Sequence, residues 1–297
     1  MPHTRHVVFK NWAGIAVAGE IKWEASSVDK KNHLNKATWL TAVVETGAKF
    51  GSINSYDGAG LSAGLEQTIA LFPRTMEQGE LWSVLAKFDE VLPDTNPNWV
   101  ALKASLDHAG WYLDSRGVLR NKGTGSLVGG TEIRHELSPS NGVVPDHGPD
   151  FLKAVLWAET FHNLFSDPAT FQTQIRLTKN SILSGNKIVE SQVYRRYAKV
   201  EDASAAIVGT NITPELDLAM CIYHSFSVNA PSKAKAVLQT ALDKSLGPID
   251  FSKILVTSLG KNTYANWQNR YIRTRAEARK SGLFDESLFS EIAPAHL

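Results

Sequence analysis

The sequence predicts a mainly α-helical protein of the α+β class, and two observations support this fold class. Apolar residues recur at three- and four-residue spacing over much of the 297-residue chain, as in helices with one buried face. The helical period is interrupted where glycines cluster, at residues 50–64 and 111–149, and short strands are expected there. Because the sequence contains no repeat and no Gly-Ser linker, we expect a single domain over residues 1–297, with 111–149 as a β- and loop-rich insertion.

The composition excludes several classes of partner. Hydrophobic residues make up 43% and charged residues 21% of the chain, which is ordinary for a soluble globular protein. The 31 basic and 30 acidic residues give a net charge of +1, so we expect no nucleic-acid partner. The N-terminus lacks the apolar run of a signal peptide, and no later segment is long and apolar enough to span a bilayer. We therefore expect synthesis in the cytoplasm and no membrane span.

The first helix is expected from residue 34 to Gly47, because its apolar residues follow one helical stripe. Residues 1–30 before it are expected to form a short strand or an irregular arm. After the helix, an alternating pattern interrupted by Asp57 and its neighbouring glycines predicts a hairpin. The run that begins near Gln67 predicts a second helix.

The remaining helices are predicted from apolar periodicity and from local start and stop signals. The run Asp94-Thr-Asn-Pro97 supplies a cap, and Pro214 follows the capping residue Thr213, which places a proline in the first turn of two helices. Several others end at or before a glycine or a proline. The predicted ranges are 77–92, 99–109, 150–165, 167–183, 188–197, 213–226, 234–242 and 267–284.

Two carboxyl groups lie at the bends of the N-terminal region. Glu45 lies in the last turn of the expected first helix, where apolar neighbours and the negative end of the helix dipole favour a carboxyl that keeps its proton. Asp57 lies in a glycine turn near water and is expected to stay ionised. A glycosidic bond is usually cleaved by such a pair, in which one group donates a proton and the other acts on water or on the developing cation. Glycines at 58, 60 and 64 would leave room for a sugar ring against the backbone.

A helix that ends in Glu45 is followed by the hairpin Ser-Tyr-Asp-Gly-x-Gly-x-Ser-Ala-Gly over residues 55–64. This arrangement resembles the lysozyme superfamily, which includes muramidases, lytic transglycosylases and chitosanases. Segments 213–242 and 267–284 are similar to the central helix beside the cleft and to the basic C-terminal helix of these enzymes. The resemblance implies a lysozyme-like helical domain with a small β-hairpin at the active-site cleft, and a glycoside hydrolase in which Glu45 is the general acid and Asp57 its partner. The substrate-binding residues that we expect are Ser52, Asn54, Tyr56, Ser62 and Gln67.

Several alternatives stay open within this interpretation. Glu45 and Asp57 are twelve residues apart, fewer than in the chitosanase pattern, so Glu66 is another candidate for the second carboxyl and an enzyme with Glu45 alone is a further arrangement. The near-neutral charge disfavours chitosan, a polycation, and makes bacterial peptidoglycan the expected polymer, with a chitosanase-like hydrolase as the alternative.

A different class of protein also fits the pattern. In a non-catalytic glycan-binding or structural protein on the same scaffold, Asp57 would only form the turn, by bonding backbone amides. If the protein is a wall-cleaving enzyme, it acts at the cell wall or in the periplasm, and it would leave the cell by lysis, in a phage particle or through a contractile secretion machine.

The cysteine of the chain and the histidines of the insertion are expected to have no catalytic role. Cys221 is the one cysteine, which excludes an intramolecular disulfide, and its apolar neighbours favour a buried, unreactive thiol. The insertion gathers histidines and acids whose spacing matches no zinc motif. These residues are His135, Glu136, His147 and Asp150. We therefore expect no metal site and no cofactor.

Overall fold

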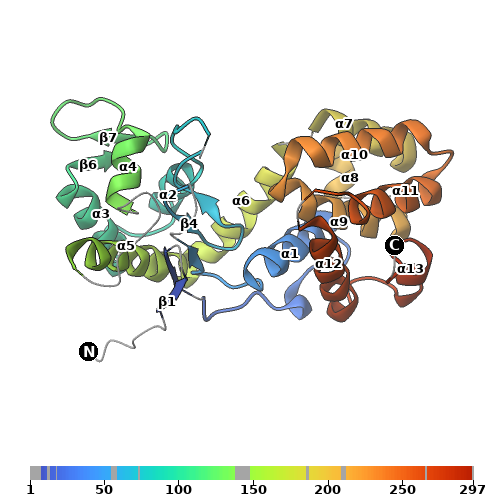
Figure 1. Cartoon of the computed structure of the whole chain (residues 1–297), viewed down its shortest axis with the longest axis horizontal. Coiled ribbons are helices and arrows are strands. Elements are labelled where there is room, and N and C mark those ends of the chain that lie inside the picture. The colour runs from blue at the N-terminus through green and yellow to red at the C-terminus, as the bar shows by residue number, and fades with distance from the viewer. Residues whose placement is uncertain are drawn as a thin grey trace. The chain divides into compact units, whose positions relative to one another are not determined.

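The fold class is the one that the sequence predicts (Figure 1). Over the described residues, the computed structural model is mainly α-helical with two small antiparallel sheets. The described residues are 8–11, 14–17, 19–54, 59–72, 74–137, 148–184, 187–208, 212–264 and 266–295. The chain divides into two compact units, the first formed by 1–22 with 49–177 and the second by 23–48 with 178–297. The expectation of a single domain over residues 1–297 stays a prediction.

The first unit contains a five-stranded antiparallel sheet in the order β1-β2-β3-β4-β5. The predicted hairpin is present as β3 and β4, in which Asn54 pairs with Ser62. The prediction of a helix from Gln67 is wrong. Gln67 has a φ of 56°, outside the helical range, and its side-chain amide donates hydrogen bonds to the carbonyls of Ser52 and Gly64. These bonds close a turn that leads into β5. The strands are β1 (Val8–Asn11), β2 (Gly14–Val17), β3 (Ile53–Asn54), β4 (Ser62–Ala63) and β5 (Thr68–Ile69).

Helix α5 (Pro149–Phe165) supports this sheet, since it packs against β2, β3 and β4 and also against α3 and α4. Aromatic side chains form the centre of this core, with Trp157 stacked between Trp111 and Phe161. The predicted insertion at 111–149 contains a two-stranded hairpin and a helix, and residues 138–147 lie outside the described part. The other elements of this unit are α2 (Leu81–Asp89), α3 (Pro97–His108), β6 (Trp111–Leu113), β7 (Leu119–Asn121), α4 (Gly130–Leu137) and the short turn Pro168–Thr170.

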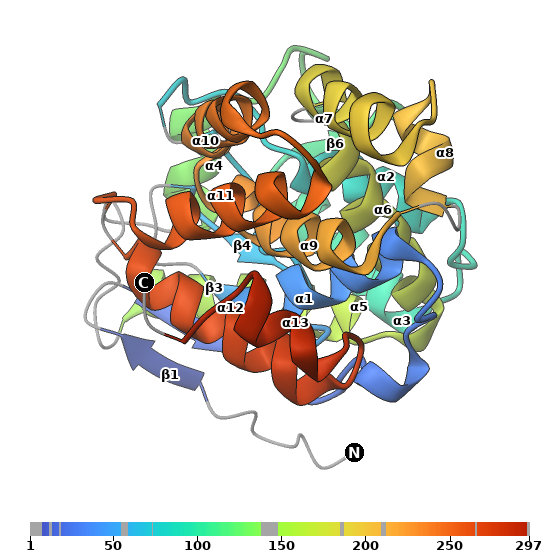
Figure 2. The same cartoon turned by 90° about the vertical axis from the view of Figure 1, so that its right-hand side faces the viewer.

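Helix α9 (Pro214–Asn229) is the central element of the second unit (Figure 2). Every residue from 216 to 227 is buried, as expected for a helix that is covered on all sides. The predicted cap is present, because the Thr213 hydroxyl accepts from the amide of Leu216 at 3.3 Å. The helices that pack against α9 are α1 (His33–Thr46), α10 (Pro231–Lys244), α11 (Pro248–Gly260), α12 (Trp267–Ser281) and α13 (Glu286–Glu291).

Shorter elements complete the second unit, and a longer helix crosses the sequence boundary between the units. That helix is α6 (Phe171–Ser184). The shorter elements are the turn Ala25–Ser27, α7 (Lys187–Val193), a five-residue π-helical turn (Tyr194–Ala198) and α8 (Ala203–Val208).

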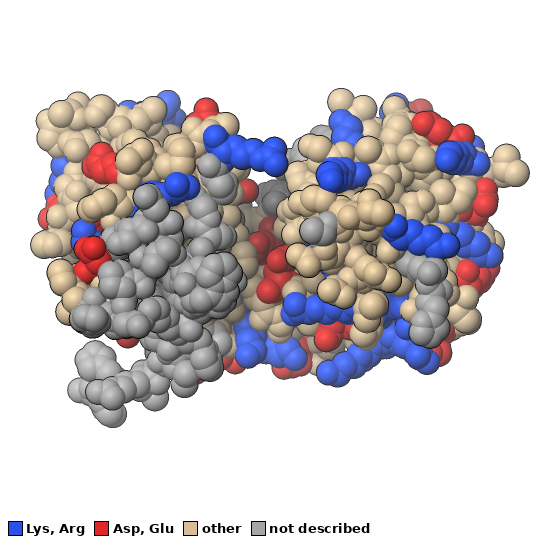
Figure 3. Space-filling view, viewed as in Figure 1, with Lys and Arg blue, Asp and Glu red and all other residues tan. Residues whose placement is uncertain are grey.

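The distribution of charge on the surface and the length of the helices agree with the predictions from the composition. On the face shown in Figure 3, basic and acidic side chains are mixed over the described surface, as the net charge of +1 suggests. Throughout the described part of the chain, the helices are too short or too polar to cross a lipid bilayer.

Candidate functional site

Glu45 lies in the last turn of α1, in the second unit, where the helical pattern places it. The helix ends at Gly47, which has a φ of 71° and whose amide donates to the carbonyl of Val43 at 3.0 Å. The side chain of Glu45 remains 21% exposed, so its carboxyl group is accessible from solvent while its backbone belongs to a buried helix.

Arg270 of α12 holds the Glu45 carboxyl group. Its Nη2 donates to Oε1 of Glu45, and its Nε donates to the carbonyl oxygen of Ser225 at 2.8 Å. The Arg270 side chain is 12% exposed, and its two contacts join α12 to the C-terminal parts of both α1 and α9. One helical turn further along α12, Arg273 donates to the carbonyl of Val43 at 3.3 Å. Two arginines of α12 thus fix the end of α1.

This environment differs from the apolar one that the sequence suggested for Glu45. The described partner of the carboxyl is a guanidinium, because the arginines of the basic C-terminal helix turn toward α1. The spacing of Arg270 and Arg273 was a signal that these two side chains share a face, but the sequence did not indicate which acid they meet.

Four of the expected substrate-binding residues are described, and all four belong to the first unit. Ser52 and Ser62 are buried, at 9% and 2% exposure, and the Ser52 hydroxyl both accepts from the amide of Gly19 and donates to the carbonyl of Lys49 at 3.3 Å. Asn54 and Gln67 are half-buried and hydrogen-bonded to each other. The amide pair is therefore partly exposed but already hydrogen-bonded, whereas the serines are buried in the framework of the sheet.

The remaining residues of the expected site lie outside the described part of the chain. These are Tyr56 and Asp57, together with Gly58. Glu66, the other candidate for the second carboxyl, lies in the turn before β5 and is half-buried. The position of the second carboxyl group thus stays a prediction.

Gly64 has a packing role. Its φ is 78°, and a Cβ atom on this residue would lie 2.6 Å from Cδ1 of Phe165, closer than packed atoms approach. The absence of a side chain at Gly64 therefore lets the hairpin pack closely against α5. The sequence suggested a different reason for this glycine, namely contact with a sugar ring.

The acids and histidines of the insertion form no described metal cluster. Glu136 accepts from the ammonium group of Lys153 at 2.8 Å and from the indole of Trp157 at 3.2 Å, and His147 lies outside the described residues. Among the residues that the structure describes, the group with donor atoms close enough for a metal ion is His33, Asp217 and Cys221 in the second unit. The sequence analysis missed this group because it treated Cys221 alone, although Asp217 and Cys221 share a helix face at a spacing of four.

A cavity of about 590 Å³ in the first unit lies between α2, α3 and β6. It is lined by aromatic side chains such as Tyr112, and its lysines are already paired. Lys103 donates to Asp94 at 2.9 Å, and Lys122 binds Asp107. The cavity contains none of the residues expected at the catalytic site.

No family model matches the chain, and no curated protein or solved structure matches it significantly. Assignment to the lysozyme superfamily therefore depends on the sequence motifs quoted above.

Proposed function

We propose that the protein is a lysozyme-like glycoside hydrolase that cleaves bacterial cell-wall glycan, with Glu45 as its general acid. The observation that carries the proposal is the constraint on Glu45. Its carboxyl group is fixed by a largely buried arginine at the end of a buried helix, yet the Glu45 side chain stays 21% exposed. An acid that only solubilises a surface needs no such restraint, whereas proton donation to a leaving oxygen requires a carboxyl group in a defined orientation.

The contact with Arg270 acts on both sides of the proton transfer, because a guanidinium favours the ionised carboxyl before the reaction and also stabilises the carboxylate that is left after it. A protonated carboxyl group keeps one oxygen that accepts hydrogen bonds and carries its proton on the other. Because Arg270 binds Oε1, the proton would reside on Oε2 and point to the substrate. After the proton has moved to the glycosidic oxygen, the carboxylate that remains is stabilised by the adjacent guanidinium.

The hairpin residues complete the proposal. Asn54 would bind a sugar hydroxyl, and Gln67, whose side-chain amide is bonded to Asn54, Ser52 and Gly64, would hold Asn54 in position. Asp57 would hold water or stabilise the positive charge that develops on the sugar. Peptidoglycan is the proposed polymer because the near-neutral chain has no acidic surplus to attract a polycation such as chitosan.

The test is release of reducing ends from purified peptidoglycan and, in parallel, from chitosan. We expect turnover of peptidoglycan by the wild type, and a loss of about 10²–10⁴-fold in Glu45→Gln, which keeps the shape of the side chain but cannot donate the proton. Glu201→Gln alters an exposed acid of the same unit and serves as the matched control. Activity above about a tenth of wild type in Glu45→Gln would remove Glu45 from the mechanism.

Two other results would redirect the proposal. Turnover of chitosan in preference to peptidoglycan would favour the chitosanase-like alternative. Binding of either glycan with no release of reducing ends would favour a non-catalytic glycan-binding protein.

A further inference from the structure

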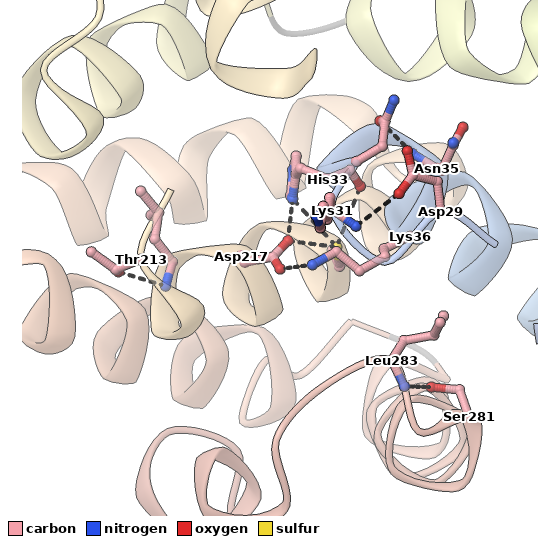
Figure 4. Close-up of polar contacts among 12 residues, drawn as sticks. Asp29, Lys31, His33, Asn35, Lys36, Thr213, Asp217, Ser281 and Leu283 are labelled. Atoms are coloured by element: carbon pink, nitrogen blue, oxygen red, sulfur yellow. Dashed lines mark hydrogen bonds and ion pairs between the residues drawn. The ribbon is translucent and has the colours of Figure 1, made fainter. Parts of the chain in front are cut away.

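A second group of reactive side chains lies in the core of the second unit. It is separate from Glu45, because His33 and Glu45 occupy opposite ends of α1, about 18 Å apart along the helix axis at 1.5 Å per residue. His33 is the first residue of α1, and Asp217 and Cys221 lie four apart on α9. Figure 4 shows His33, Lys36 and Asp217 converging where α1 meets α9. His33 and Asp217 are 2% and 9% exposed, and Cys221 is fully buried.

The donor atoms of these three residues surround one point. Nδ1 of His33 lies 2.6 Å from Oδ1 of Asp217, and Sγ of Cys221 lies 3.6 Å from that nitrogen and 3.7 Å from that oxygen. In a tetrahedral zinc site, bonds of about 2.3 Å to sulfur and 2.0–2.1 Å to nitrogen or oxygen place the sulfur about 3.5 Å from the other two donors. The two distances from the thiol already have this length.

We propose that His33, Asp217 and Cys221 bind a divalent transition-metal ion of the zinc class. The remaining distance, from nitrogen to oxygen, is closed by a hydrogen bond. It must open to about 3.3 Å when the ion takes the place of the shared proton, which moves to Nε2 of the same ring and is donated there to the Tyr194 hydroxyl. Imidazole, carboxylate and thiolate together are ligands that zinc accepts, whereas magnesium and calcium prefer oxygen alone.

The outer atoms of two ligands are held in the manner expected of a metal site. The Nε2 atom of His33 lies 3.1 Å from the hydroxyl of Tyr194, and Oδ2 of Asp217 binds the ammonium group of Lys36. These contacts leave Nδ1 and Oδ1 directed at the thiol, and such partners commonly orient metal-binding histidines and carboxylates. Tyr194 opens the π-helical turn, a local irregularity that is frequent at functional sites.

The same geometry excludes a cysteine–histidine nucleophile. In that arrangement, the thiol and the carboxylate contact different nitrogens of the imidazole ring. Here both contact Nδ1, and Nε2 is directed at Tyr194.

His224 is an independent sign that this region is prepared for a ligand. It is fully buried, its ring lies 5.9 Å from that of His33, and both of its nitrogens lack a hydrogen-bond partner among the described residues. A buried imidazole without partners requires an explanation. His224 would provide the fourth ligand, or it would bind a water molecule that occupies the fourth position.

The charges are also compatible with a divalent ion. A thiolate and a carboxylate neutralise the ion, and the remaining positive charge on Lys36 lies 5.3 Å from the centre of the Phe284 ring, which attracts a cation. Burial raises the pKa of the Cys221 thiol, so the metal-free protein carries the protonated thiol.

The experiment uses the full chain without a purification tag, stripped of metal by a chelator. Titration with Co²⁺ should give about one ion per chain and a thiolate-to-cobalt charge-transfer band, and Zn²⁺ should remove the band by displacement. Cys221→Ser should abolish the band. Tyr194→Phe should retain it but weaken binding by about 10–100-fold, as loss of an orienting partner does. His108→Ala, an exposed histidine of the first unit, is the matched control and should bind as the wild type does.

Absence of a charge-transfer band in the wild type would overturn the proposal, whether or not the ion binds elsewhere. Unchanged binding in Tyr194→Phe would overturn the assigned orientation of His33. If Cys221→Ser does not fold, the wild-type spectrum and the Tyr194→Phe titration still decide. Glycan cleavage is not needed for any of these measurements, so the outcome is independent of the proposed function.

Discussion

Arg270 defines the environment of Glu45, because one guanidinium binds both the carboxyl group and the carbonyl oxygen of Ser225. The planar guanidinium has several donors in a fixed geometry, whereas an ammonium group is a compact charge without a fixed direction. The arginine is therefore expected to control the direction of the acid as well as to supply a charge.

Arg270→Lys should lower kcat on peptidoglycan by about 10²-fold and change KM little, since it keeps the charge but releases the carboxyl from its fixed direction. Initial rates over a range of glycan concentrations measure this. Arg279→Lys is the control, because Arg279 lies on the same helix and pairs with Glu286 at an exposed position. An unchanged kcat in Arg270→Lys would show that orientation by the arginine is unnecessary.

Asp57→Asn tests the second carboxyl group. On the catalytic interpretation, turnover falls by about 10²-fold or more, because an amide cannot act as a base or balance a cation. On the turn interpretation, Asn forms the same local bonds and is nearly neutral, while Asp57→Ala loses stability. We expect the catalytic result, measured as reducing-end release with thermal unfolding in parallel. Wild-type turnover by the Asn variant would instead indicate an enzyme with Glu45 alone.

The candidate site could be predicted only in part at the level of residues. The place of Glu45 at a helix end follows from the local spacing of apolar residues and from Gly47. The contact between Glu45 and Arg270 joins residues that are 225 positions apart in the sequence. The contacts of His33 with Asp217 and Cys221 also join distant residues, more than 180 positions apart. Such contacts depend on how helices pack, and no local pattern encodes them.

Among the elements, the hairpin depends on its fit to α5. Phe165 faces Gly64 at a distance that leaves no room for a methyl group. The strands β3 and β4 have only two residues each, so this contact contributes much of what keeps the hairpin in place.

Gly64→Ala should destabilise the protein by about 1–3 kcal/mol beyond the cost of a positive φ, because the added methyl group overpacks the core. Gly110→Ala is a close control, since Gly110 has a φ of 76° and no atom within 4 Å of its would-be Cβ. It should cost about 1 kcal/mol. Urea unfolding of the two variants measures the difference, and equal midpoints would contradict the packing role.

Helix starts could be predicted where the signal is local. Asn96 accepts from the amides of Asn98 and Trp99, and Thr213 caps α9, both directly before a proline. The turn at Gln67 could not be predicted, because it is closed by hydrogen bonds that the Gln67 side-chain amide donates to the carbonyls of Ser52 and Gly64. The alternation of small and apolar residues there suits either a strand or a helix.

At the scale of the whole molecule, the second unit contains a buried pair of titratable side chains, Glu190 and His224. The second unit buries Glu190 at 1% exposure, with Oε1 3.7 Å from Nδ1 of His224. Burial raises the pKa of Glu190 to about 8 and lowers that of His224 well below its usual value. At neutral pH, both groups are therefore uncharged, and their proximity is not an ion pair.

Glu190 should make the protein less stable as the pH rises. The pKa of Glu190 in the folded protein lies above its unfolded value of 4.5. The contribution of Glu190 to the free energy of unfolding is therefore highest below pH 4.5 and falls as the pH rises to about 8. Glu190→Gln, which cannot ionise, should remove this decline and be more stable than wild type at pH 9 by a few kcal/mol. Denaturant unfolding at pH 5 and pH 9 measures the effect. Glu201→Gln should keep the wild-type decline, and a parallel decline in Glu190→Gln would refute the assignment.

The division of the chain also determines when the protein can act during its synthesis. The second unit uses residues 23–48 and 178–297, so α1 emerges from the ribosome long before α9 and α12 exist. Contacts so distant in sequence form slowly and late. Glu45 has no Arg270 until the C-terminal helix has been translated. If the proposed activity is correct, prematurely terminated chains cannot cleave glycan, and a cell that makes this protein is exposed only to completed molecules.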